Sequence, residues 1–140
     1  MIRVVHFIHG LNMGGAETLV KDYAVLLDKS KFHVTVLCYE RFDSPYETIL
    51  QQNNIPVVYL CDEMPFYGKT GLIAKLVNRF QRYWLVRREL QQLDPDIVHF
   101  HLSLSDYVRF SGLKKSVKLF IHNISVQRFG NQKTRVIFKI

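Results

Sequence analysis

Two adjacent glycines, Gly14 and Gly15, are the residues of this sequence best placed to do chemistry. They follow an apolar stretch at 2–8 and precede a segment, 19–27, in which apolar residues recur at helical spacing. A strand, a glycine loop and a helix start together turn backbone N–H groups and the positive end of the helix toward an anion. The sequence therefore predicts a phosphate site here, for a nucleotide or a phosphorylated sugar. The alternative is that the glycines only permit a tight turn with positive φ.

The spacing of the glycines excludes two common phosphate-binding loops. A dinucleotide-binding loop requires Gly-x-Gly-x-x-Gly, whereas the glycines here stand at positions 10, 14 and 15. A P-loop requires Gly-Lys followed by Ser or Thr, whereas Ala16 and Glu17 follow Gly15. The anion site is therefore expected to be of another type.

A second group that could do chemistry is the pair His99 and His101, two residues apart in an apolar stretch. On a strand both side chains project to the same face, and such a pair can hold a metal ion. The sequence supplies no obvious third ligand near them, so we predict no metal site. His6 and His9 are expected on opposite sides of the first strand, with His9 nearer the glycine loop. We find no Ser-His-Asp or Cys-His arrangement.

Segments with strand and helix patterns alternate along the chain, and they must position these groups. Strands are predicted over 2–8, 33–39, 55–60, 96–101 and 117–122. Helices are predicted after Gly14-Gly15, from the spacing over 19–27, and over 45–50, 72–93 and 104–113. This alternation predicts an α/β fold, a Rossmann-like parallel sheet with helices on both faces. The stretch 125–140 gives no clear assignment. Because it ends on an apolar run, we expect that a longer protein has been cut here.

Length and composition indicate one folded domain. The chain has 140 residues, 48% of them hydrophobic and 22% charged. Nineteen basic residues against twelve acidic ones give a net charge of +7, which favours an anionic partner. We expect a phosphorylated ligand or an anionic membrane surface and no nucleic acid, because no nucleic-acid-binding motif accompanies the charge.

Location and the role of the cysteines follow from what the sequence lacks. No apolar run approaches the ~18 residues of a membrane-spanning helix, and the start has no signal-peptide layout. We therefore expect a cytoplasmic protein. Two cysteines, Cys38 and Cys61, do not make a disulfide framework, and we expect buried thiols without a catalytic or metal role.

The predicted helix at 72–93 carries two separate arcs of side chains. Lys75, Arg79 and Arg82 cluster on a basic arc. The other arc is apolar and includes Leu72, Ile73, Leu76, Val77, Phe80, Tyr83 and Trp84. An apolar face with tryptophan beside a basic face is typical of a helix that lies at a membrane interface, whereas the alternative is a core helix with a solvated far side. We predict peripheral membrane contact through Lys75, Arg79, Arg82 and Trp84, at the inner face of the plasma membrane.

Three motifs together resemble the N-terminal half of a GT-B glycosyltransferase of the retaining, group 1 (family 4) type. They are Gly14-Gly15-Ala16-Glu17, Asp94-Pro95-Asp96-Ile97-Val98-His99-Phe100-His101 and Ile121-His122-Asn123, in the order in which the family has them. The resemblance covers about residues 1–125. It implies one half of a GT-B fold, in which the N-terminal domain receives the acceptor and a C-terminal domain across a cleft binds a nucleotide sugar.

The resemblance also implies what is missing. The paired glutamates of the family's C-terminal domain have no counterpart in residues 1–140, so we expect the donor-binding domain to be absent and this chain alone to be inactive. The donor is expected to be UDP- or GDP-linked, with no cofactor and no metal. The intact parent would be a hexosyltransferase of polysaccharide biosynthesis, acting on a cell-envelope, lipid-linked or glycan acceptor. The alternative is a non-catalytic Rossmann-like module that binds a phosphorylated ligand or a protein partner.

Carried over position by position, the resemblance gives roles to individual residues. The backbone amides of Gly14 and Gly15 would approach the donor diphosphate, where negative charge develops during transfer. His122 would be the catalytic residue, with a hydrogen bond to a sugar hydroxyl; the alternative is a histidine that caps the sheet. The acceptor side would comprise His9, His99, His101 and Asn123. Glu17 is expected to be structural, because a carboxylate would repel a diphosphate.

Overall fold

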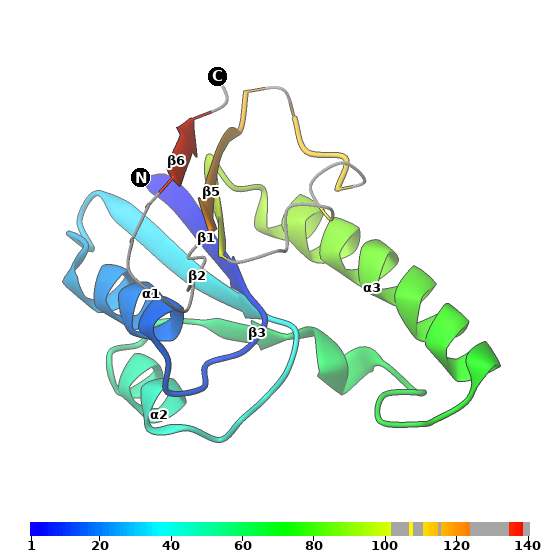
Figure 1. Cartoon of the computed structure of the whole chain (residues 1–140). Coiled ribbons are helices and arrows are strands. Elements are labelled where there is room, and N and C mark those ends of the chain that lie inside the picture. The colour runs from blue at the N-terminus through cyan, green and yellow to red at the C-terminus, as the bar shows by residue number, and fades with distance from the viewer. Residues whose placement is uncertain (102–106, 108–110, 115, 124–134, 139–140) are drawn as a thin grey trace.

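A computed structural model describes residues 1–101, 107, 111–114, 116–123 and 135–138 of the chain (Figure 1). The strands are β1 (Ile2–Ile8), β2 (Phe32–Cys38), β3 (Val57–Tyr59), β4 (Ile97–His101), β5 (Lys118–Asn123) and β6 (Arg135–Phe138). They form one sheet in the order β3-β2-β1-β4-β5-β6. Neighbours among β1 to β5 pair in parallel, and β6 pairs antiparallel with β5. The predicted parallel α/β fold is therefore confirmed, with an antiparallel strand added at one edge.

The strand order places a switch point between β1 and β4. The chain runs from β1 outward through β2 to β3, then returns to the other side of β1 for β4 and β5. In parallel α/β sheets, ligands bind outside the carboxyl ends of the strands at such a point. The loop after β1 and the end of β4 are therefore the places to look for a site.

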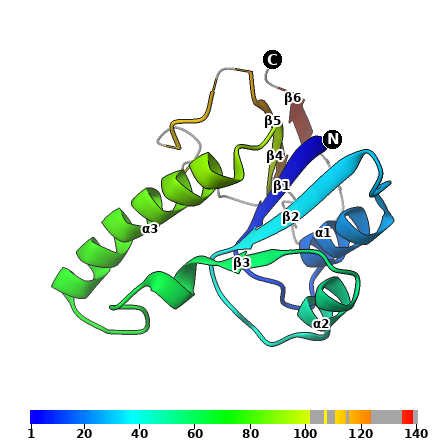
Figure 2. The ribbon, with the colours of Figure 1, turned by 180° about the vertical axis from the view of Figure 1, so that it is seen from behind.

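Helices cover both faces of the sheet, as the alternation of segments predicts. They are α1 (Gly15–Leu26) and α2 (Pro45–Gln52) on one face and α3 (Leu72–Leu93) on the other, and a short 3-10 helix, η1 (Leu60–Glu63), precedes α3 (Figures 1 and 2). Successive β1 residues alternate between the two layers: Val4 packs on the α1 side and Val5 on the α3 side. Both faces of β1 are thus buried, which explains its nearly continuous apolar sequence.

Local signals set the helix boundaries. Ser44 precedes α2, and its Oγ accepts a hydrogen bond from the backbone N–H of Glu47 at 3.4 Å, with Pro45 in the first helical turn. α3 ends where Asp94 adopts the left-handed conformation, with φ of 42°, directly before Pro95. The predicted bounds of the long helix, 72–93, are confirmed to the residue.

Three predictions differ from the structure or lie outside it. The third strand is shorter than predicted, because the chain enters η1 at Leu60. Most of the helix predicted at 104–113 falls outside the described residues. The stretch 125–140, which gave no assignment, contributes β6 at 135–138.

Both cysteines carry free thiols: Cys38 is buried and Cys61 is half-buried.

Candidate functional site at the carboxyl ends of the strands

The start of α1 lies at the carboxyl edge of the sheet, after the loop that leaves β1 (Figure 1). Gly14 is the N-cap residue, and its carbonyl oxygen accepts hydrogen bonds from the backbone N–H and the hydroxyl of Thr18, at 3.0 and 2.7 Å. The N–H groups of the first turn have no acceptor within the helix. They form, with the helix dipole, the positive end that the sequence predicts.

The glycines of this turn are not required by backbone strain. Gly14 has φ of −126° and ψ of 177°, an extended conformation that any residue adopts, so the tight turn with positive φ is not what the structure shows. A Cβ at Gly15 would meet no other atom within 4 Å, and one at Gly14 would meet the carboxylate of Glu17. The space beside Gly15 is therefore open to a ligand, and Glu17 lies against the turn.

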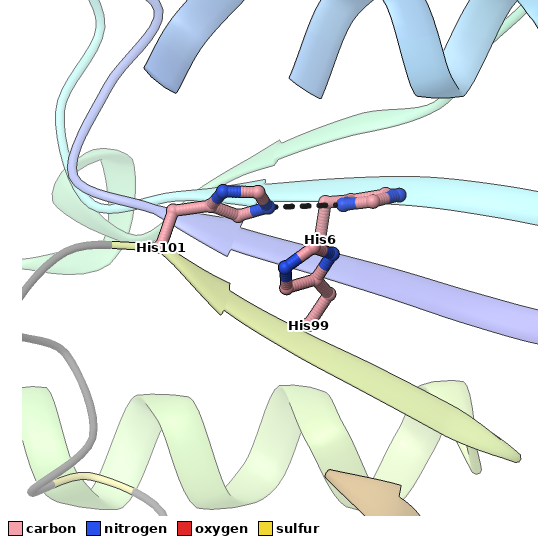
Figure 3. Close-up of side chains that lie close together, drawn as sticks. All are labelled: His6, His99 and His101. Atoms are coloured by element: carbon pink, nitrogen blue, oxygen red, sulfur yellow. Dashed lines mark hydrogen bonds between the residues drawn. The ribbon is translucent and has the colours of Figure 1, made fainter. Parts of the chain in front are cut away.

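Three histidines gather on the side of the sheet that faces α1 (Figure 3). His6 comes from β1, and His99 and His101 come from β4. Nδ1 of His6 and Nε2 of His101 are 3.1 Å apart, a hydrogen bond in which one imidazole donates to the other. The ring of Tyr23 on α1 stacks on His6, with centroids 5.9 Å apart. His6 and His101 are buried, and His99 is half-buried.

The imidazole of His6 is neutral in the folded chain. Burial, and then the neighbouring His99, lower the pKa of His6 from 6.5 to about 3. Nε2 of His6 is buried and has no hydrogen-bond partner in the described part of the chain.

The histidine cluster bears on the prediction that no metal binds. The premise that no third ligand lies near His99 and His101 is wrong, because His6 stands opposite His99 in the register of β1 and β4. One ligand atom from each of the three residues lies within 4.8 Å of the others, so they have the composition of a three-histidine metal site. The His6–His101 contact has the length of an ordinary hydrogen bond, which a pair of neutral imidazoles makes without a cation. The absence of a metal stays a prediction.

His122 and Asn123 close β5 at the same edge of the sheet. His122 pairs with His101 of β4 on one side and with Val136 of β6 on the other. Asn123 pairs with Arg135. The proposed catalytic position is therefore next to the histidine cluster in the sheet register.

His9 lies on the opposite side of the site from His6, as predicted. It follows β1, and its Nε2 is 3.3 Å from a carboxylate oxygen of Glu40, which follows β2. Its ring also lies 5.4 Å, between centroids, from the ring of Tyr39. His9 is exposed, so it is accessible to a ligand.

A cavity of about 770 Å³ opens beside Tyr39, between the end of β2, the loop before α3 and α3 itself. We call it the basic cleft, and its main lining residues are Tyr39, Tyr67, Lys69, Lys75, Arg79 and Arg82. The Arg82 guanidinium carbon lies 4.0 Å from the centroid of the Tyr39 ring. The basic arc of α3 therefore lines a cavity at the carboxyl edge of the sheet, with Arg82 half-buried and Lys75 and Arg79 exposed.

The apolar arc of α3 faces away from the protein. Five of its seven members are exposed: Leu72 (76%), Ile73 (78%), Leu76 (51%), Phe80 (74%) and Trp84 (60%), whereas Val77 and Tyr83 are half-buried and Tyr83 lines the basic cleft. We call these five residues the apolar row. The alternative of a core helix with a solvated polar side is wrong for the first three turns of α3, and it holds only for the second half, where Leu85, Val86 and Leu90 are buried. No described helix is both long and apolar enough to cross a bilayer.

Sequence reasoning missed the tyrosines of the basic cleft and Lys69. They come from three segments that meet only in the folded chain, and the one available signal was the basic arc of α3.

A larger cavity of about 900 Å³ lies beside α2 and β3. Its cation Arg41 is neutralised by Asp62, with Nη2 and Oδ2 2.7 Å apart, so it offers less to an anion.

The sequence profile described as Glycosyltransferase Family 4 matches residues 13–135. The chain belongs to this family, and its fold is that of the N-terminal domain of a GT-B glycosyltransferase.

Solved structures agree with this fold. The crystal structure of MurG from Acinetobacter baumannii matches with a TM-score of 0.62 and 18% identity, over 92% of this chain and 37% of that protein. UDP-GlcNAc 2-epimerase from Neisseria meningitidis, bound to UDP-GlcNAc, matches with a TM-score of 0.51 and 12% identity, over 91% of this chain and 33% of that protein. The chain thus spans about a third of the length of each. A comparison with curated protein sequences gave no significant match.

Proposed function

We propose that this chain is the acceptor-binding half of a retaining glycosyltransferase, which moves a sugar from a nucleotide-sugar donor to a cell-envelope, lipid-linked or glycan acceptor. Family membership supports a transferase parent. The observation that carries the proposal is the arrangement at one sheet edge: the open glycine turn at the start of α1 follows β1, and the ends of β4 and β5 lie beside it in the strand order. The hexosyltransferase type and a role in polysaccharide biosynthesis belong to the same proposal.

In this proposal the glycine turn stabilises the leaving group. As the bond from the donor sugar to its diphosphate breaks, negative charge builds on the phosphate oxygens. Amides of the first turn of α1, together with the helix dipole, offer donors that are already oriented. The space beside Gly15 lets a diphosphate held by a second domain approach them.

His122 is proposed as the catalytic residue, and the other histidines divide into two roles. At the end of β5, His122 would hydrogen-bond a hydroxyl of the donor sugar near the acceptor. His9 is exposed and, with Asn123, forms the acceptor side. His101 is 1% exposed, so we assign it and His99 to positioning the strand ends beside the acceptor.

The donor is proposed to be UDP- or GDP-linked, and the transfer to require no cofactor or metal. The epimerase of similar fold binds UDP-GlcNAc, which makes UDP sugars the first choice for testing. An enzyme that draws on backbone and side-chain donors for the leaving diphosphate retains its activity in EDTA. A loss of activity in EDTA that Zn²⁺ restores would contradict this part of the proposal and implicate the three histidines.

The proposed location is cytoplasmic and peripheral at the inner face of the plasma membrane. The apolar row is exposed, and the exposed basic residues Lys75 and Arg79 lie on the same helix turns. An exposed apolar stripe with flanking cations is typical of a helix that lies on an anionic bilayer. Trp84, at 60% exposure, would lie at the interface.

The test uses the full-length protein with UDP- and GDP-sugars. We expect calorimetry to detect donor binding, slow donor hydrolysis without acceptor, and retention of the anomeric configuration in the product, as seen by NMR. His122→Ala should lower hydrolysis by about 100-fold. The control His33→Ala, an exposed histidine of β2, should leave it unchanged. Absence of any nucleotide-sugar binding would overturn the proposal in favour of the non-catalytic module.

A further inference from the structure

The basic cleft holds polar atoms that the described protein does not use. Nε of Arg82 and Oδ1 of Asn78, both on α3, are buried without a hydrogen-bond partner among the described residues. The amide nitrogen of Asn78 donates to the backbone oxygen of Phe66 at 2.9 Å, which leaves Oδ1 turned away from that bond. Buried polar groups without partners cost about 1–3 kcal/mol each, so such a cluster is typical of a place where a ligand completes the bonds.

The charges of the basic cleft select an anion. Four cations line it, Lys69, Lys75, Arg79 and Arg82, against one carboxylate, Glu40. None of the four cations forms an ion pair within the described parts of the chain, and Glu40 is already engaged by His9. Arginine guanidinium groups match the oxygens of a phosphate in two-pronged hydrogen bonds.

The side chains of the cleft are held ready for such a ligand. The guanidinium of Arg82 packs over the ring of Tyr39, which is buried at 3% exposure. Burial, and then Glu40, raise the pKa of Tyr67 to about 12, so its hydroxyl stays protonated and interacts with the Glu40 carboxylate at the edge of the cleft. Oδ1 of Asn78 is an acceptor and suits a sugar hydroxyl beside the phosphate.

The apolar row runs along α3 beside the basic cleft. Lys75 and Leu76 are neighbours in sequence, as are Arg79 and Phe80, so each of these two cations is followed by an apolar residue on the exposed side. A molecule with its charged group in the cleft would therefore lay an attached hydrocarbon chain along the row, toward a bilayer.

We propose that the basic cleft binds the phosphate or diphosphate group of a lipid-linked acceptor. This inference rests on the proposed function and names its acceptor class. The cleft lies next to the transfer edge, because Tyr39 contacts both Arg82 and the ring of His9, whose centroid is 5.4 Å from that of Tyr39. The acceptor sugar would extend from the phosphate past Tyr39 toward His9.

The experiment measures binding to the full-length protein by calorimetry with water-soluble probes. Farnesyl diphosphate supplies the charged group and a short chain, inorganic pyrophosphate the charge alone, and farnesol the chain alone. Vesicles of anionic phospholipid, without a phosphorylated acceptor, separate a specific site from attraction to lipid headgroups. The test variant is Lys75→Gln/Arg79→Gln, and the control is Arg87→Gln, which removes an exposed charge from the same helix outside the cleft.

We expect farnesyl diphosphate to bind more tightly than pyrophosphate and farnesol not to bind measurably. The double variant should weaken farnesyl diphosphate at least about tenfold, since each lost charged hydrogen bond contributes strongly. Arg87→Gln should leave the affinity unchanged. Both charged residues of the double variant are exposed, so the melting temperature should not change.

Two results would overturn the inference: farnesyl diphosphate that binds equally well to the double variant, or a protein that binds anionic vesicles but none of the soluble diphosphates. Nucleotide-sugar binding is measured on the same samples. Donor binding without farnesyl diphosphate binding would defeat this inference alone, whereas farnesyl diphosphate binding without donor binding would defeat the proposed transferase and leave an anion site.

Discussion

The guanidinium of Arg82 lies over the ring of Tyr39, with its carbon 4.0 Å from the ring centroid. This contact joins the two sides of the site, because Arg82 belongs to α3 and Tyr39 follows β2. The ring of the exposed His9 lies 5.4 Å, between centroids, from the ring of the same tyrosine. A change in Arg82 therefore reaches both the basic cleft and the acceptor side.

Replacement of Arg82 should separate its binding role from its structural one. Arg82→Gln removes the cation–π contact and should cost about 1 kcal/mol of stability, with about a tenfold rise in KM for a phosphorylated acceptor. Arg82→Lys keeps the charge but loses the planar group, so it should recover only part of the affinity. Steady-state kinetics and thermal denaturation measure both effects. An unchanged KM in Arg82→Gln would show that the cleft does not hold the acceptor.

The sequence predicted the helices α1, α2 and α3 and the sheet type because their signals are local. The bounds of α3 follow from an amphipathic run between Gly71 and Asp94-Pro95. The parallel sheet follows from alternating segments. The positions of the glycine turn and of His122 at one sheet edge follow in turn, since parallel strands end on the same side.

The orientation of α3 and the histidine cluster depend on contacts between segments that are distant in the sequence. Which side of α3 faces the sheet is set by its second half: Val86 is buried and lies one turn after Arg82. The basic arc therefore lines the cleft, and most of the apolar arc is exposed. The periodicity of 72–84 alone does not predict this orientation. The third histidine was missed for a similar reason. His6 approaches His99 only because β4 returns to pair with β1.

Gly15 offers a way to separate folding from catalysis. Gly15 is the first residue of α1, and a Cβ at this position would meet no other atom within 4 Å. Gly15→Ala should therefore leave stability unchanged or raise it by up to about 1 kcal/mol, because the unfolded chain loses freedom. The transfer rate should fall by about 10- to 100-fold, because the methyl group would stand between the amides and the donor diphosphate.

Rate and stability are measured on the same preparation of full-length enzyme. The control is Met13→Ala, which truncates an exposed side chain in the same loop and should leave the rate near that of the wild type. A Gly15→Ala enzyme of wild-type rate would mean that the diphosphate does not approach this turn.

The buried His6 should make the protein less stable in acid. In the unfolded chain an imidazole takes up a proton below pH about 6.5, whereas the folded His6 stays neutral because its pKa is about 3. The unfolded state therefore binds more protons between these values. The free energy of unfolding should fall as pH decreases from about 6.5 toward 3, by up to about 1.4 kcal/mol per pH unit, with no contribution above pH about 7.

Denaturant unfolding at a series of pH values measures this slope. His6→Gln should make the free energy of unfolding less dependent on pH, by up to about 1.4 kcal/mol per pH unit, which is what one proton contributes. His33→Gln removes an exposed histidine and should leave the pH dependence near that of the wild type. An NMR titration of the imidazole gives an independent reading, in which the His6 resonances should not shift between pH 8 and about 4.5. A His6 that titrates near pH 6.5 would contradict the expected environment.

Membrane contact should depend on the apolar row. Ile73 and Phe80 are exposed by 78% and 74%, so Ile73→Ser/Phe80→Ser removes no packing within the described chain and should leave the melting temperature unchanged. Each apolar side chain that enters a bilayer contributes about 1.5–3 kcal/mol, so the double variant should lower the affinity for vesicles at least about tenfold. Sedimentation with anionic and zwitterionic vesicles measures the affinity.

The control is Leu26→Ser on α1, which removes a leucine of 79% exposure from the opposite face of the sheet and should sediment like the wild type. If the wild-type protein fails to sediment with anionic vesicles at low salt, the apolar row is not a membrane contact and must be covered by protein.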